Sequence, residues 1–316
     1  MSRYINPFTD FGFKRIFGEE SNIDILMNFL NSLQFHPLEI TKISFKKNEN
    51  LGTSIVDRKA IFDLYCQDSR GNRFIVELQR VEQEFFKDRA LYYSTFAIQE
   101  QAGVGTWNYK LAGVYFIGIL DFELKGEKEK KDKYMHNIVL MDKDDKTIFY
   151  NKLEYKFIEV PKFNKKEDEL ETILDKWIYF FKYLHTLEER PDFMNNDMFI
   201  KAFGIAEMNN LNKEKRLEYE ASLKAYRDLY VILDESFEKG KNEGKVEGEV
   251  IGIEKGKIES LENSIITILE TKFNSPISQK IIDTIKSYND IEILNNLLIK
   301  VINLSLIHIS EPTRPY

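Results

Sequence analysis

Two apolar runs that lie close together, at 61–66 and 74–79, constrain the fold of this chain more than any other feature. Each run alternates as half-buried β-strands do, with every second side chain on the same face, so we expect Phe62 and Leu64 to share one face. Between them, the Ser-Arg-Gly segment at 69–71 has the composition of a three-residue hairpin loop whose glycine is left-handed. The sequence therefore predicts an antiparallel hairpin in which residue 68 pairs with residue 72.

Polar side chains interrupt both runs on one predicted face of this hairpin. Asp63 stands in the first run, and Glu77 and Gln79 stand in the second. The predicted pairing sets Asp63 directly opposite Glu77, with Cβ atoms only ~5 Å apart, and places Gln79 two positions further along the same face. A carboxylate in an apolar strand is costly to bury unless its charge is compensated. Two neighbouring carboxylates therefore indicate a shared divalent cation, and Mg²⁺ is a hard, oxygen-preferring ion that suits them.

Each of these polar residues also has a plainer explanation. Asp63 could be a solvent-exposed residue at a strand edge, and Glu77 with Gln79 could form the exposed face of an amphipathic strand. We favour the metal site because the predicted register links the two acids.

The composition is that of an ordinary soluble protein. The 316 residues suffice for one large core with appendages or for two domains, and 43% of them are hydrophobic and 31% charged. The net charge of −7 argues against a chain that coats nucleic acid by bulk charge, but it leaves room for a local basic surface. The four histidines lack the spacing of zinc ligands, so we expect no zinc site.

The single cysteine, Cys66, falls inside the first apolar run and is most simply a small core residue. A disulfide within the chain is excluded, which fits a reducing cytoplasm. No apolar run approaches the ~18 residues of a membrane-spanning helix, and the N-terminus lacks the apolar region of a secretory signal. We therefore expect a cytoplasmic protein without a membrane segment.

The first half of the chain combines helical and strand-like patterns. We predict helices over 6–33 and 84–101, and strands over 39–45, 111–120, 134–141 and 146–159. Thr9 or Asp10 would cap the first helix, and Ser21 with Asp24 resembles a capping box for a second. From residue 166 onward the pattern is helical, over 170–187, 197–208 and 213–237.

Five glycines recur every fourth residue between 240 and 257, embedded in Lys and Glu. Each costs a helix about 1 kcal/mol relative to Ala, so this tract is a weak helix by itself. We interpret it as a linker or a self-association stalk, and the alternative is a repeat that drifts without a function. Amphipathic helices predicted over 258–273 and 277–304 follow, and we expect a homo-oligomer through this C-terminal helical region.

The end of the chain, 304–316, has an unusual sequence. Its segment LSLIHISEPTR resembles the peptide obtained by translating through a transposase-type sequencing-library adapter. We interpret 304–316 as a non-native read-through and leave it out of the fold prediction.

Three blocks in this chain, in this order, resemble the PD-(D/E)XK nuclease superfamily. Within it, they are most similar to the branch of recombination-promoting nucleases or putative transposases. The blocks are the opening NPFTDFGFKRIFGEE with Asp10, Phe13, Lys14 and Phe17 at the usual spacing, the hairpin strands DRKAIFDLYC and NRFIVELQR, and the helix segment RALYYST. The Gly-Lys-Glu repeat is also common in such proteins, and the likeness covers roughly residues 1–250.

This resemblance implies an α/β fold, a restriction-endonuclease-like α/β/α core with a central mixed sheet, followed by a helical C-terminal extension. We place the nuclease-like domain at 1–190 and a helical extension at 191–239. The repeat at 240–257 would be a linker or stalk, and 258–303 would form the C-terminal helices.

By position, the resemblance assigns the catalytic set to Asp63, Glu77 and Gln79, with Asp63 and Glu77 as metal ligands. Gln79 stands where most superfamily members have a catalytic Lys, although this branch commonly has Gln there. A Lys supplies positive charge to the developing pentavalent phosphate, whereas Gln supplies only a neutral donor and acceptor. A metal ion would then have to do more of the work, or Arg80 or Lys59 would take the role.

Three further residues are candidates. Asp10 would add a third acid, but it is also a good N-cap. Arg89 and Tyr92, about one turn apart on the predicted third helix, would contact the DNA backbone, unless they are ordinary helix-face residues.

The function that the resemblance implies is a Mg²⁺-dependent DNA endonuclease, with Mn²⁺ as a second candidate ion. It would cleave DNA with little sequence specificity and be associated with recombination or transposition. Two alternatives stay open. The first is an inactive nuclease-derived DNA-binding module, which Gln79 and the acidic charge favour. The second is an interaction protein that assembles through the stalk and has no nucleic-acid activity.

Overall fold

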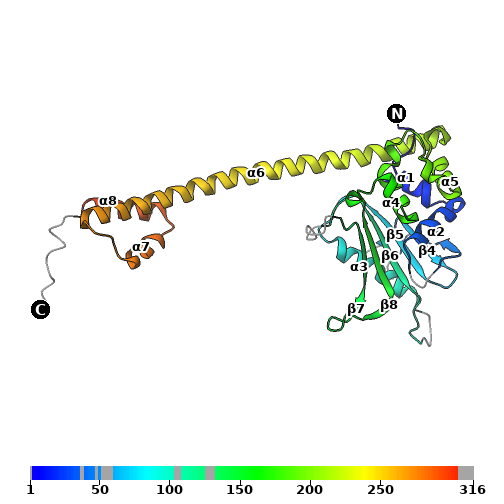
Figure 1. Cartoon of the computed structure of the whole chain (residues 1–316), viewed down its shortest axis with the longest axis horizontal. Helices are drawn as coiled ribbons and strands as arrows, with labels where there is room; N and C mark the ends of the chain where they lie inside the picture. Colours follow the sequence, from blue (N-terminus) through cyan, green and yellow to red (C-terminus); the bar gives the residue numbers. More distant parts are fainter. Residues whose placement is uncertain are drawn as a thin grey trace. The chain divides into compact units, whose positions relative to one another are not determined.

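The structure is a computed structural model (Figure 1). It describes residues 2–35, 39–46, 49–50, 60–102, 108–124 and 132–304, with the backbone alone at 49–50 and 60–61. Lys59 and all but the first residue of the suspected non-native segment 304–316 lie outside the described residues.

The chain divides into two compact units, Met1–Asp228 and Leu229–Tyr316. The domain boundary expected at residue 190 falls inside the first unit, because the helices that follow it pack on the N-terminal helices. The finer division expected for the C-terminal part stays a prediction.

The first unit is built around a six-stranded mixed sheet in the order β1-β4-β5-β6-β8-β7. Its strands are β1 (Ile43–Phe45), β4 (Leu64–Asp68), β5 (Arg73–Gln79), β6 (Val114–Leu120), β7 (Met135–Met141) and β8 (Ile148–Glu159). The three central strands β5, β6 and β8 are parallel, and the other neighbours are antiparallel. A separate pair joins β2 (Glu49–Asn50) to β3 (Ala60–Ile61).

Helices cover both faces of this sheet, which gives the α/β/α architecture expected from the sequence (Figure 1). One face is covered by α3 (Phe86–Gln99). The other is covered by α1 (Asp10–Phe17), α2 (Ile23–Ser32), α4 (Ile173–Tyr183) and α5 (Asp197–Ala206), together with the first turns of α6 (Lys213–Phe273). Short 3₁₀ turns lie at Glu20–Asn22, Val160–Lys162, Glu167–Glu169, Leu184–Thr186, Asp192–Met194 and Met208–Asn210.

The helix starts near the N-terminus differ from each other in how they are capped. Thr9 is the N-cap of α1, and its hydroxyl accepts a hydrogen bond from the Gly12 backbone N at 3.0 Å. The capping box expected at Ser21 and Asp24 is wrong, because Ser21 lies in a 3₁₀ turn and Asn22 precedes α2 without a side-chain cap bond.

The β4–β5 hairpin has the predicted register. Leu64 pairs with Val76, and the Asp68 backbone N donates to the Asn72 carbonyl at 2.9 Å. Gly71 has a φ of 85°, the left-handed conformation that a residue with a side chain adopts only at a cost. The loop chemistry therefore sets which residues of the two strands face each other.

The first apolar run is not one continuous strand, contrary to our prediction. β3 ends at Ile61 and β4 begins at Leu64, with a bend at residues 62–63. Phe62 packs with Tyr65 under α3, whereas Leu64 packs on the opposite face. The prediction that Phe62 and Leu64 share a face was wrong because the bend interrupts the alternation.

The second unit contains the distal part of α6 with α7 (Gln279–Lys286) and α8 (Ile291–Ile302). The glycine tract is helical, and the helix predicted over 277–304 is two helices because a turn follows Lys286. The small core consists of Ile265, Ile285, Leu294 and Val301. None of the helices that the structure describes is long and apolar enough to cross a membrane.

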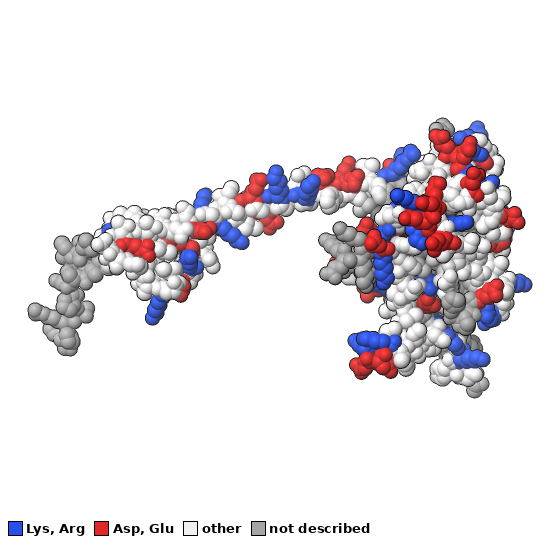
Figure 2. Space-filling model, in the orientation of Figure 1, with Lys and Arg blue, Asp and Glu red and all other residues white. Residues whose placement is uncertain are grey.

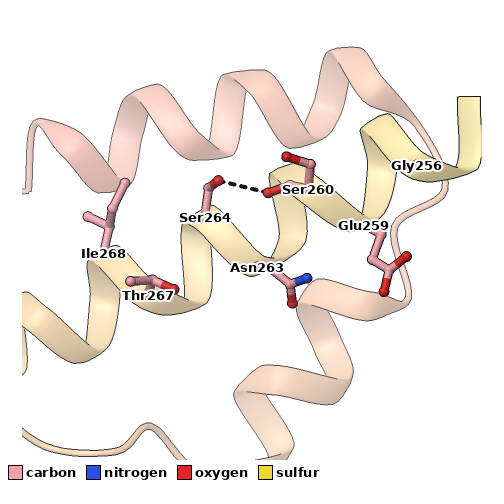
Figure 3. A pocket seen from close by; sticks show the side chains of 7 residues that line it. All are labelled: Gly256, Glu259, Ser260, Asn263, Ser264, Thr267 and Ile268. Carbon is pink, nitrogen blue, oxygen red and sulfur yellow. Dashed lines mark hydrogen bonds between the residues drawn. The ribbon is translucent and has the colours of Figure 1, made fainter. Parts of the chain in front are cut away.

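A hollow of about 650 Å³ lies along one side of α6 in this unit (Figure 3). It is lined mostly by small and polar residues, namely Gly256, Glu259, Ser260, Asn263, Ser264, Thr267 and Ile268. The Ser264 hydroxyl donates to the Ser260 carbonyl at 2.7 Å.

Candidate nuclease site

The acidic residue of β5 lies deep in the first unit. Glu77 alternates with Val76 and Leu78, so it faces α3 while its neighbours face the larger core. Its exposed fraction is 1%, and that of Gln79, two residues further on, is 7%. Neither side chain belongs to a solvated strand face, which was the plainer explanation for them.

Asp63 lies beside Glu77, at the bend that precedes β4. The Asp63 backbone N donates to Glu77 Oε1 at 3.2 Å, and the Leu78 backbone N donates to Asp63 Oδ2 at 2.8 Å. Asp63 directly precedes Leu64, which pairs with Val76, so the hairpin register brings the two acids to the same end of the two strands.

Burial and mutual repulsion make the ionised form of these acids costly. Burial, and then the negative charge of Asp63, raises the pKa of Glu77 to about 8, although Arg89 opposes the rise. Burial also raises the pKa of Asp63, against the hydrogen bond from Leu78, and the charge of Asp10 adds to the rise. The pair therefore has more negative charge than its surroundings compensate.

A cation from α3 lies beside Glu77. Arg89 Nη2 lies 3.3 Å from Glu77 Oε2, and Arg89 Nη1 donates to Gln83 Oε1 at 2.8 Å. The guanidinium also lies 5.0 Å from the centre of the Tyr93 ring. Gln79 Nε2 donates to the same Glu77 oxygen at 3.1 Å. Arg89 therefore places a positive charge beside Glu77 and Gln79, and the roles expected of Arg80 and Lys59 stay predictions.

A family model described as PD-(D/E)XK nuclease family transposase matches residues 7–236. The chain belongs to this family. Searches of curated proteins and of solved structures found no match. Nucleases of the PD-(D/E)XK family generally use divalent metal ions.

The other candidate residues of this PD-(D/E)XK protein differ in how they relate to Asp63 and Glu77. Asp10 is the first residue of α1, pairs with Lys14 at 2.9 Å, and lines the same cavity as Asp63. Burial raises the pKa of Asp63, and the charge of Arg80 opposes that rise. Tyr92 is exposed, and its ring packs against Phe96.

Sequence reasoning missed part of the surroundings of Asp63. A cavity of about 450 Å³ opens beside it, and α6 contributes Lys215 and Ser222 to the lining. No local signal marks Lys215, because only the fold brings the start of α6 to the N-terminal helix.

The donor chemistry suits a hard cation. Within the described part of the chain, no group of three or more His, Cys, Asp or Glu side chains gathers as a metal site. Asp63 and Glu77 provide two carboxylates, and the nearby cations compensate them only partly, since both pKa values stay raised. Such a pair fits a Mg²⁺ or Mn²⁺ ion that keeps several waters, because these ions prefer oxygen ligands.

Proposed function

We propose that this protein is a divalent-metal-dependent DNA endonuclease that hydrolyses phosphodiester bonds with little sequence specificity. The observation that supports this most is the contact between the buried Glu77 and the half-buried Asp63 at one end of the hairpin. A buried carboxylate pair is costly to maintain, and the family's nuclease chemistry gives a reason for it.

In this proposal, Asp63 and Glu77 hold Mg²⁺ or Mn²⁺. When bound, such an ion polarises the scissile phosphate and lowers the pKa of a bound water. Gln79 and Arg89 hold Oε2 of Glu77, so that Oε1 stays directed at Asp63. Arg89 also favours the ionised Glu77 that a metal requires.

The substrate class follows from the family, whose description as a nuclease family transposase implies DNA. Figure 2 shows acidic and basic side chains interspersed on the face that it draws. Contacts to DNA phosphates orient the backbone but carry no sequence information, which supports low specificity. A role in recombination or transposition is consistent with the transposase description of the family.

The test is incubation of purified protein with supercoiled plasmid in Mg²⁺ or Mn²⁺, beside EDTA and an Asp63→Ala variant. We expect nicked or linear DNA from the wild type with metal, and none in EDTA or from the variant. DNA binding without cleavage in either metal would instead support the inactive binding module. Equal cleavage by Asp63→Ala would refute the assignment of the site.

Arg89→Gln is expected to slow cleavage about 10- to 100-fold, because Glu77 loses its only nearby cation among the described contacts. Arg89→Lys retains the charge and should lose less. Initial cleavage rates at saturating metal measure the effect, and Lys87→Gln, an exposed change on the same helix, is the control. An unchanged rate for Arg89→Gln would assign Arg89 a purely structural role.

A further inference from the structure

The cavity beside Asp63 has one wall that belongs to α6. Its volume is about 450 Å³, which lies within the range of small-ligand sites. The wall is held in place by two hydrogen bonds to the N-terminal segment. The Asn6 backbone N donates to the Tyr219 hydroxyl at 2.9 Å, and the Phe11 backbone N donates to Ser222 Oγ at 3.1 Å. The start of α6 is therefore a fixed part of this cavity.

Two cations that line this cavity, Arg15 and Lys215, contact Glu19 at different distances. Glu19 binds Arg15 through both carboxylate oxygens, at 2.7 and 2.8 Å. Lys215 reaches the same carboxylate only at 3.4 Å, and 39% of its side chain is exposed. Burial works against ionisation of Glu19, but Arg15 and Lys215 outweigh it and hold its pKa below the usual value. Lys215 can thus leave Glu19 without depriving that carboxylate of its main partner.

A phosphate is the ligand that suits this arrangement. The cavity opens at Asp63, where the scissile phosphate lies if the proposed function holds. Each DNA strand carries one phosphate per ~3.4 Å of helix axis, so a neighbouring phosphate comes close to the same cavity. Lys binds phosphate as a point charge and needs no fixed geometry.

We propose that Lys215 binds a DNA backbone phosphate next to the scissile one, and that Glu19 is its partner only in the DNA-free protein. This inference rests on the proposed function. It makes the start of α6, whose role the sequence did not indicate, a part of the substrate-binding surface.

The competing explanation is that the Lys215–Glu19 pair only ties α6 to the N-terminal helices. The two explanations predict different effects of Glu19→Gln on DNA affinity. A structural tie between Lys215 and Glu19 is lost by changing either partner, and Glu19→Gln also breaks the pair with Arg15. A phosphate contact is lost only with Lys215, whereas Glu19→Gln removes a competitor and a negative charge.

The experiment measures binding of a short fluorescent DNA duplex by anisotropy, in EDTA, over a series of salt concentrations. We expect Lys215→Gln to weaken binding about three- to tenfold and to reduce the slope of log affinity against log salt by about one. Glu19→Gln should bind as tightly as the wild type or more tightly. The control, Lys224→Gln, lies nine residues further along the same helix, which places it on the opposite face, and should bind like the wild type.

Thermal unfolding of each variant shows whether it is folded. Lys215→Arg keeps the charge, so it should bind DNA nearly like the wild type. The inference is overturned if Lys215→Gln matches the wild type in affinity and salt slope. It is also overturned if Glu19→Gln loses as much affinity as Lys215→Gln. If the wild type cleaves plasmid normally in either case, the proposed function stands and only the role of Lys215 falls. A wild type that neither binds nor cleaves DNA would overturn both.

Discussion

Glu77→Gln is expected to make the metal-free protein more stable while reducing cleavage at least about 100-fold. The activity falls because a neutral amide is a poor ligand for a hard cation. The stability rises because Gln has nearly the same shape as Glu but no charge to bury beside Asp63. This gain exceeds the loss where the Gln amide nitrogen faces one of the N–H donors to Glu77. The two effects have opposite signs, and a merely structural Glu77 would not produce them together.

The gain in stability depends on pH, and its sign follows from proton binding. The pKa of Glu77 is about 8 in the fold, against an ordinary value of 4.5, so between these values the folded state keeps a proton that the unfolded chain has lost. Stability therefore falls as pH rises through this window. At about 1.4 kcal/mol per pKa unit, the titration of Glu77 should cost the wild type about 3 kcal/mol between about pH 5 and pH 8. Glu77→Gln should lose less, because it keeps only the contribution of Asp63, whose pKa burial also raises.

Chemical denaturation in EDTA at both pH values measures this difference. Glu123→Gln, a change at an exposed site near the end of β6, is the control and should alter the free energy of unfolding by less than about 0.5 kcal/mol. Adding Mg²⁺ should reverse the order of stability, because a ligand stabilises only the protein that binds it. A Glu77→Gln variant less stable than the wild type at pH 8 in EDTA would mean that the fold compensates this carboxylate.

Trp177→Ala is expected to lower the free energy of unfolding by about 4 kcal/mol, the typical cost of removing a large buried aromatic side chain. Trp177 is fully buried on α4, and its ring packs against Phe17 of α1 and Phe29 of α2. Its indole N donates to Asn28 Oδ1 at 2.9 Å. The loss should be large because the ring joins α4 to the helix that carries Asp10.

Phe149→Ala is the control for this change, since Phe149 on β8 is 81% exposed. It should alter the free energy of unfolding by less than about 0.5 kcal/mol in the same denaturation series. A loss below about 1 kcal/mol for Trp177→Ala would show that the surrounding side chains collapse into the vacated space.

The hairpin was the part of the fold that the sequence predicted best. The glycine at the loop and the alternation of β5 determine its register locally, and Asp63 came to lie beside Glu77 as predicted. The face of Phe62 was predicted wrongly because nothing in the alternation marks the bend before β4. Local patterns therefore predict pairing well, but they do not predict where a strand is interrupted.

The surroundings of the acids could not be predicted to the same degree. Periodicity placed Arg89 on a helix after the hairpin, but the contact with Glu77 depends on how closely α3 packs on the sheet. Lys215 lies far from Asp63 in the sequence, and only the packing of α6 on the N-terminal segment brings it to the cavity. Both contacts arise from tertiary packing, which single-sequence patterns do not encode.

The three-residue loop of the β4–β5 hairpin cannot gain or lose a residue without changing the site. A single inserted or deleted residue at 69–71 would shift β5 by one position and exchange the faces of its side chains. Val76 and Leu78 would then point toward α3, while Glu77 and Gln79 would enter the larger apolar core. Substitutions at the loop are compatible with the site as long as the residue at 71 accepts a positive φ, whereas a change of loop length would remove the carboxylate pair in one step.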